Sequence, residues 1–200
     1  MPDAIHLKSI YTKRGDKGET GLLYGGRVSK ADPRVQAYGA CDEAVSALGL
    51  ARALCRDSWV REQILEAQKE LFIVAAELAT DRSSYGLLQK HFSTVKLEMT
   101  ARLERLIDKI SAEIRLPRSF IVPGASAGSG ALDLARATLR RTEREVVALS
   151  ETGQVENPEI LRYLNRLADL LFMLARYEDR HTPFEALTGD APAQASKGRA

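Results

Sequence analysis

The stretch that decides the fold is NPEILRYLNRLADLLFMLARYEDR, residues 157–180. It opens with Asn157 and Pro158, a cap residue followed by a proline that fits the first turn of a helix. Apolar residues then recur three and four positions apart, at Leu161, Leu164, Ala168, Leu171 and Ala175. This spacing places them on one helical face, so the stretch predicts a long helix that packs closely against others.

Four further segments have helical patterns. Asp32 and Pro33 repeat the start signal of a cap followed by a proline. The additional helices are expected at residues 32–56, 59–80, 95–115 and 125–150. Residues 81–94 are expected to be a connection between two of them. The sequence therefore predicts an all-α fold, a five-helix bundle with the up-down packing of ferritin-like proteins.

The N-terminal segment, residues 1–31, is rich in glycine and lysine and does not follow the helical pattern. We expect an ordered glycine-rich loop or an extended segment here. Its composition leaves two interpretations open. It is a solvated, flexible terminus, or its backbone N–H groups and cations form an anion site. It holds no Walker A motif.

The composition limits the class of protein. The chain has 200 residues, 44% of them apolar, and a net charge of +2. These values suit one globular domain, expected over residues 1–188 with a mobile tail at 189–200, and argue against nucleic acid or a membrane as partner. Cys41 and Cys55 are expected to be free thiols, which favours a cytoplasmic location.

Polar residues on three of the expected helices are candidate site residues. Arg136, Arg140, Glu143 and Arg144 share one helical face and would suit a phosphate chain, or they form an ordinary solvated face. Asn165, Asp169, Phe172 and Arg176 form a narrow polar strip beside the apolar seam, which is either an interhelical polar network or the lining of a site. Asp42 and Glu43 pose the same choice near the start of their helix.

Other catalytic patterns are weak. The sequence contains no G-x-S-x-G motif and no Cys/His pairing that would indicate a nucleophile. A single Glu-x-x-His, Glu178 to His181, falls short of the paired motifs that a di-metal bundle needs. We therefore do not expect a di-metal site.

Three motifs in order resemble PduO-type ATP:cob(I)alamin adenosyltransferases. They are YTKRGDKGETGLLYGGRVSKADPRVQAYGACDEAVSALGLAR at residues 11–52, FIVPGASAGSGALDLARATLRRTEREVVAL at 120–149 and YLNRLADLLFMLARYE at 163–178. The resemblance implies a homotrimer of helical bundles with sites between subunits. It also implies transfer of the 5′-deoxyadenosyl group of ATP to the cobalt of cobalamin or a cobalamin precursor, with release of triphosphate. Mg²⁺ would enter with ATP, and a flavoprotein reductase would supply Co(I).

The resemblance also assigns roles to individual residues. A nucleotide loop is implied at Thr12, Lys13, Arg14, Gly15, Thr20, Gly21 and Lys30. Further ATP contacts are implied at Arg140, Arg141, Glu143, Arg144 and Asn165, with Glu143 as a candidate Mg²⁺ ligand beside the phosphates. Asp42 and Arg136 resemble an inter-subunit salt bridge that shapes the site. Phe120 resembles the aromatic beneath the corrin, and Asp169 is expected on the corrinoid side.

The chain departs from the family pattern at several positions. Arg27 follows Gly25-Gly26 where an acid is usual, Val45 replaces an asparagine, and Ala125 replaces a glycine. Thr142 stands in place of an alanine. None of these changes removes an implied phosphate contact. Two rival functions stay open, a carrier that binds ATP or adenosylcobalamin without turnover and a helical scaffold that has lost activity.

Overall fold

The structure, a computed structural model, describes residues 11–183 and residue 185. These residues form six α-helices, α1 (Pro33–Leu54), α2 (Ser58–Leu78), α3 (Tyr85–His91), α4 (Leu97–Glu113), α5 (Ala127–Glu151) and α6 (Glu159–Glu178). A 3₁₀ turn η1 (Arg82–Ser84) and two strands, β1 (Glu19–Gly21) and β2 (Arg27–Ser29), complete the described elements. The expected all-α class is confirmed. The helix count is six rather than five because the expected connection at 81–94 contains η1 and α3.

Local capping marks the starts of α1 and α5. The Asp32 carboxylate accepts a hydrogen bond from the Arg34 backbone N–H at 2.8 Å, and Pro33 occupies the first turn of α1. Ser126 and Ser129 form a reciprocal capping box at the start of α5. The cap-then-proline signals therefore predicted the starts of α1 and α6 to within about two residues.

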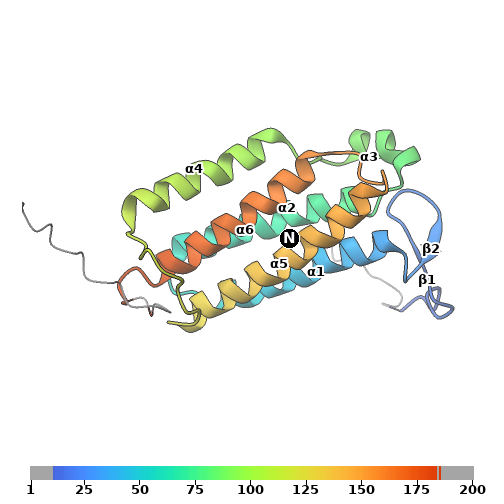
Figure 1. Cartoon of the computed structure of the whole chain (residues 1–200). Helices are drawn as coiled ribbons and strands as arrows, with labels where there is room; N and C mark the ends of the chain where they lie inside the picture. Colours follow the sequence, from blue (N-terminus) through green and yellow to red (C-terminus); the bar gives the residue numbers. More distant parts are fainter. Residues whose placement is uncertain (1–10, 184, 186–200) are drawn as a thin grey trace, which may run out of the picture.

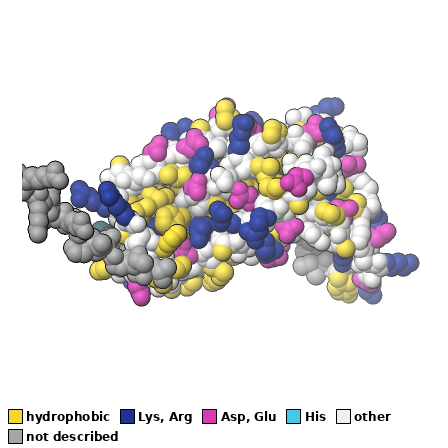
Figure 2. Space-filling view, viewed as in Figure 1, with side chains coloured by type: hydrophobic (Ala, Val, Ile, Leu, Met, Phe, Trp, Pro, Cys, Tyr) yellow, Lys and Arg dark blue, Asp and Glu magenta, His cyan; other side chains and the backbone are white. Residues whose placement is uncertain are grey.

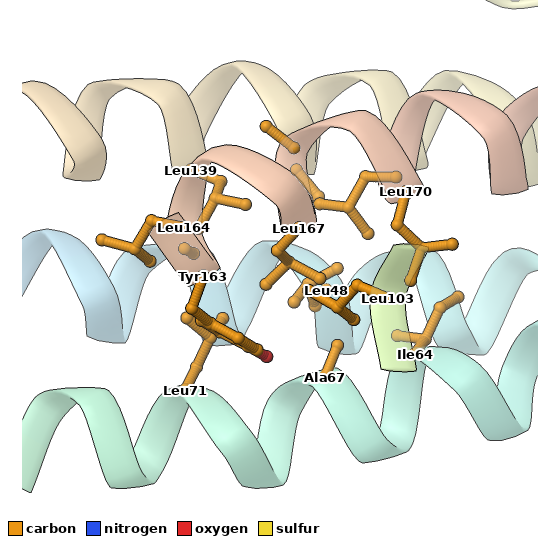
Figure 3. Packing of buried hydrophobic residues seen from close by; sticks show 14 of the residues in the cluster. Leu48, Ile64, Ala67, Leu71, Leu103, Leu139, Tyr163, Leu164, Leu167 and Leu170 are labelled. Carbon is orange, nitrogen blue, oxygen red and sulfur yellow. The ribbon is translucent and has the colours of Figure 1, made fainter. Parts of the chain in front are cut away.

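The long helices lie side by side, with α6 in the middle (Figure 1). Helix α1 packs on α2 and α5, while α6 packs on α4 and α5. Residues from all five long helices meet in the core, among them Leu48, Ile64, Leu103, Leu139 and Leu167 (Figure 3). On the predicted seam of α6, Leu164, Leu171 and Ala175 are buried. Removal of this apolar surface from water is the main force that holds the bundle together.

One buried polar group, the Tyr163 hydroxyl, is satisfied inside this core. The Tyr163 hydroxyl is fully buried and donates to the Glu70 carboxylate at 2.8 Å. Burial raises the pKa of Tyr163 well above the ordinary value.

Cys41 and Cys55 are free thiols, as expected, and both are buried. Burial, with the charge of Asp42 nearby, raises the pKa of Cys41 to about 12.

The glycine-rich segment folds as an antiparallel hairpin at one end of the bundle (Figure 1). The Leu23 N–H donates to the Ala79 carbonyl at 2.8 Å, just beyond the end of α2. Buried Arg34 joins the same end to the segment after α5, because it donates to the Thr80 carbonyl at 2.8 Å and to the Gln154 carbonyl at 2.9 Å. The hairpin therefore lies where α2 and α5 end, while the Phe120 loop lies where α5 begins.

The expected tail at 189–200 and the first ten residues of the N-terminal segment lie outside the described residues. In the part of the chain that is described, no helix combines the length and apolar character that a membrane crossing requires.

Candidate active-site cleft

A cleft of about 800 Å³ lies between α4, α5, α6 and the loop that precedes α5. On the face shown in Figure 2, hydrophobic side chains gather between α4 and the start of α5, with Lys and Arg side chains beside them. The cleft is lined by Glu104, Ile107, Asp108, Ser119, Phe120, Ile121, Arg136, Arg140, Arg166, Ala168, Asp169, Phe172 and Met173. An apolar hollow with a few convergent charges is typical of a ligand site.

Four of the site residues predicted from sequence line this cleft. Phe120 and Asp169 come from the loop and from α6, and Arg136 and Arg140 stand one turn apart on α5. Phe120 is 83% exposed, so its ring contributes little to the core and is available to a ligand. Its loop is tied to the segment after α6 by a hydrogen bond from the Val122 N–H to the Glu185 carbonyl at 2.8 Å.

Arg166 is a cleft residue that the sequence reasoning did not select. Its guanidinium donates to Glu104 at 3.1 Å and to Asp169 at 2.8 Å, and these two hydrogen bonds raise its pKa. The spacing of three between Arg166 and Asp169 was visible in the sequence. Glu104, however, is 62 positions away on α4, and only the fold brings it close.

The cationic face of α5 divides between two surfaces. Arg140 is exposed at the cleft, and its carbonyl accepts from the Arg144 guanidinium at 3.1 Å. Arg141 turns away and forms an ion pair with Glu43 of α1. Side chains four residues apart stack on one helical face, whereas adjacent ones diverge by about 100°.

Glu143 and Asn165 are brought together between α5 and α6. The Asn165 side-chain amide donates to a Glu143 carboxylate oxygen at 3.0 Å. The predicted polar strip of α6 is thus in part an interhelical contact and in part a wall of the cleft. Among the described residues, no group of three or more His, Cys, Asp or Glu side chains could hold a metal ion.

The predicted nucleotide-loop residues lie in the hairpin region, residues 11–30, which contains β1, β2 and the turn that precedes them. Lys13 adopts a left-handed conformation (φ 58°), and Arg27 closes the turn by donating to the Arg14 carbonyl at 2.7 Å. Thr20 pairs with Val28 in the hairpin, with Gly21 beside it. Thr12, Lys13, Arg14 and Lys30 are exposed. These residues do not line the cleft, which extends along α5 only as far as Arg140, whereas the hairpin lies where α5 ends.

Asp42 and Arg136 do not meet within the chain. Asp42 is exposed on α1, and Arg136 has Asp133, one turn away on its own helix, as its acidic neighbour. Asp133 in turn forms a buried ion pair with Arg176 of α6. Sequence reasoning placed Arg176 on the polar strip but missed its partner Asp133, because 43 positions separate the two.

Comparison with known proteins agrees with this architecture. The family described as cobalamin adenosyltransferase matches residues 10–178. A corrinoid adenosyltransferase of Citrobacter freundii is 39% identical over 170 residues, which are 85% of this chain and 94% of that protein. The corrinoid adenosyltransferase PduO of Salmonella typhimurium is 40% identical over 171 residues, 86% of this chain but 50% of that longer protein.

A solved structure extends the likeness to three dimensions. A variant PduO-type ATP:corrinoid adenosyltransferase from Lactobacillus reuteri, complexed with cobalamin and ATP, superposes with a TM-score of 0.81. It is 33% identical, and the match covers 89% of this chain and 98% of that one. Sequence and fold agree over nearly the same residues, and the chain therefore belongs to the cobalamin adenosyltransferase family.

Proposed function

We propose that this protein is a corrinoid adenosyltransferase, which transfers the 5′-deoxyadenosyl group of ATP to the Co(I) of cobalamin or a cobalamin precursor and releases triphosphate. The observation that carries the proposal is the cleft that Phe120, Arg136, Arg140 and Asp169 line together. The relatives named corrinoid adenosyltransferase support it, as does the Lactobacillus reuteri enzyme, which holds cobalamin and ATP.

The reaction is a displacement at the 5′-carbon of the ribose. An electron pair on Co(I) forms the cobalt–carbon bond, and the carbon–oxygen bond breaks with its electron pair going to triphosphate. Because Co(I) is a very strong nucleophile, the step needs no protein base. The protein's tasks are to hold the two substrates in line and to stabilise the negative charge of the leaving group.

Positive side chains in two places would serve the nucleotide. In the hairpin region, Lys13, Arg14 and Lys30 supply cations beside Thr12 and Thr20, while Gly15 and Gly21 leave room for the backbone to approach phosphate. On α5, exposed Arg140 and Arg144 offer forked donors that match phosphate oxygens, and Arg141 could join them after leaving Glu43. Asn165 would complete the set from α6.

The opposite part of the cleft would receive the corrinoid. The exposed apolar ring of Phe120 would occupy the space beneath the corrin and keep water or a base from the lower face of the cobalt. Loss of that axial ligand makes Co(II) easier to reduce to Co(I). The Asp169 carboxylate, held by Arg166, would accept hydrogen bonds from the amide side chains of the corrin.

Mg²⁺ would enter with the phosphates of ATP. Glu143 is the carboxylate in the α5 motif, and because only its Oε1 accepts from Asn165, its other oxygen would be available as a ligand. With no group of three ligating side chains among the described residues, the phosphates themselves would supply most of the coordination. The ion would neutralise charge on the leaving triphosphate.

A homotrimer with sites between subunits accounts for the separation of the site residues. Within one chain, the hairpin region and Phe120 lie toward opposite ends of α5, so a single copy does not bring the nucleotide loop to the cleft. A second copy could supply the loop, and the exposed Asp42 could then pair with Arg136 of its neighbour.

We propose one adenosyltransferase domain over residues 1–188, with a glycine-rich N-terminal loop and ferritin-like up-down packing. We also propose a cytoplasmic location, which suits two free thiols, and a flavoprotein reductase as partner.

The direct test is an anaerobic assay with chemically reduced cob(I)alamin, ATP and Mg²⁺. We expect adenosylcobalamin, followed by its visible spectrum, to form together with one triphosphate per turnover over many turnovers. Tight binding of ATP or adenosylcobalamin without turnover would instead favour a carrier. Absence of both binding and turnover would favour a scaffold that has lost the activity.

A further inference from the structure

Arg136 and Arg140 of α5 form the cationic wall of the cleft. A buried ion pair lies directly behind this wall. The Arg176 side chain is 2% exposed and the Asp133 side chain 6% exposed, and one Nη of Arg176 donates to Oδ2 of Asp133. Arg176 also stacks against Phe172, with its guanidinium carbon 5.3 Å from the ring centroid. Phe172 itself lines the cleft, so the pair touches the site through α6.

The same aspartate faces Arg136 on the other side. Asp133 Oδ1 lies 3.8 Å from Nε of Arg136, one turn further along α5, while Oδ2 is taken by Arg176. The Arg136 Nε is buried and finds no hydrogen-bond partner among the described residues. Asp133 thus sits between one arginine that it holds tightly and a second that it approaches without bonding.

The charges of this group decide what Arg136 can do. An isolated Asp133–Arg136 pair would be neutral, because the carboxylate would compensate the arginine. Arg176 supplies a second positive charge, so the three side chains carry +1 together, and Arg136 is the member at the cleft surface. Arg136 can therefore present its guanidinium to an anion from outside its own helix.

We propose that Asp133 and Arg176 are positioning residues that act through Arg136. Arg176 occupies Asp133 and thereby leaves the charge of Arg136 free for an anion from outside its helix. The inference rests on the proposed function, in which the external anion is either the carboxylate of Asp42 from a neighbouring subunit or a phosphate of ATP. Both are oxyanions that a guanidinium fork binds.

Substitutions at Arg176 separate this role from simple packing. In Arg176→Met the bulk and the contact with Phe172 are largely kept, but Asp133 is released and can pair fully with Arg136. We expect kcat/KM for ATP to fall about fivefold, as interaction energies between contacting residues usually allow. Arg176→Lys keeps the charge and should stay within about twofold of the wild type. The double variant Asp133→Asn with Arg176→Met should recover most of the loss, because Arg136 regains its free charge.

The decisive comparison repeats Arg176→Met in an Arg136→Met background. If Arg176 acts through Arg136, its substitution has no further effect on kcat/KM there. An equal loss in both backgrounds, with all variants folded by circular dichroism, would overturn the proposal and assign the pair to packing alone. An unchanged kcat/KM in Arg176→Met would overturn it as well.

A spectroscopic measurement keeps the test independent of turnover. In ¹⁵N-labelled protein, we expect hydrogen exchange at Nε of Arg136 to slow in Arg176→Met, because Asp133 then accepts that hydrogen bond. No slowing would contradict the proposal even if the enzyme is active. If the wild type has no activity but exchange still slows in Arg176→Met, the proposed function is contradicted. The proposed arrangement of Asp133, Arg136 and Arg176 is then still supported.

Discussion

The ammonium group of Lys30 lies 3.1 Å from the point that a β-carbon would occupy at Gly15. A β-carbon at residue 15 would shift this ammonium, the far end of an exposed side chain, by a few tenths of an ångström. Lys30 is also fixed through its backbone, whose N–H donates to the Gly18 carbonyl at 2.8 Å. A cation held against a glycine turn fits the phosphate-binding role proposed for this segment.

The first prediction concerns this contact. Gly15→Ala should displace the Lys30 ammonium and raise the KM for ATP several-fold, by about the value of one charge-assisted hydrogen bond, while thermal stability changes little. Gly26→Ala is the matched control, because a β-carbon there would meet no atom within 4 Å. Steady-state kinetics with ATP as the varied substrate checks the prediction, and equal KM values for the two variants would contradict it.

The second prediction concerns the cationic wall of the cleft. Arg140→Ala should reduce kcat/KM on the order of 100-fold, since the arginine would stabilise the charge that develops on the leaving triphosphate. ATP binding should weaken together with the rate, and isothermal titration can follow it without the corrinoid. Arg61→Ala, at an exposed position on α2, controls for the loss of one positive charge. Unchanged kinetics in Arg140→Ala would remove this residue from the site.

The third prediction separates the two halves of the reaction. Phe120→Ala should slow formation of adenosylcobalamin from cob(II)alamin with a reductant more than it slows transfer from cob(I)alamin reduced beforehand. The reason is that the ring would keep an axial ligand from Co(II), whereas Co(I) needs no such protection. The thermal midpoint should hardly change, because the side chain is largely exposed in the free chain. If both assays slow by the same factor, Phe120 does not have this role.

The fourth prediction is a pH dependence of stability. The pKa of buried Cys41 is raised from its ordinary value of 9.0 to about 12, so the unfolded chain loses this proton at lower pH than the folded chain. The stabilising contribution is therefore complete below about pH 9 and is lost as the pH rises toward 12, at about 1.4 kcal/mol per pH unit. Urea unfolding at several pH values measures it, and Cys41→Ala should flatten the slope. An identical slope in the variant would contradict the assignment to Cys41.

Much of the fold could be predicted because its signals are local. The starts of α1 and α6 follow from a cap residue and a proline, and the buried side of α6 follows from residues spaced three and four apart. The 81–94 segment was misjudged because α3, at seven residues, is too short to show a repeated helical pattern. The resemblance to a known family supplied candidate site residues, four of which line one cleft.

The sequence by itself determined the long helices, their apolar faces and the family, because helix caps and periodicity depend on neighbours within one or two turns. Only the tertiary structure decided which charges meet at the cleft and which meet in the core behind it. Glu104 meets Arg166 across 62 positions, and Asp133 meets Arg176 across 43. A sequence gives no distance between such residues, whereas the packing of α4 and α5 against α6 fixes it. The charge that Arg136 can offer at the cleft is therefore a property of the packed bundle.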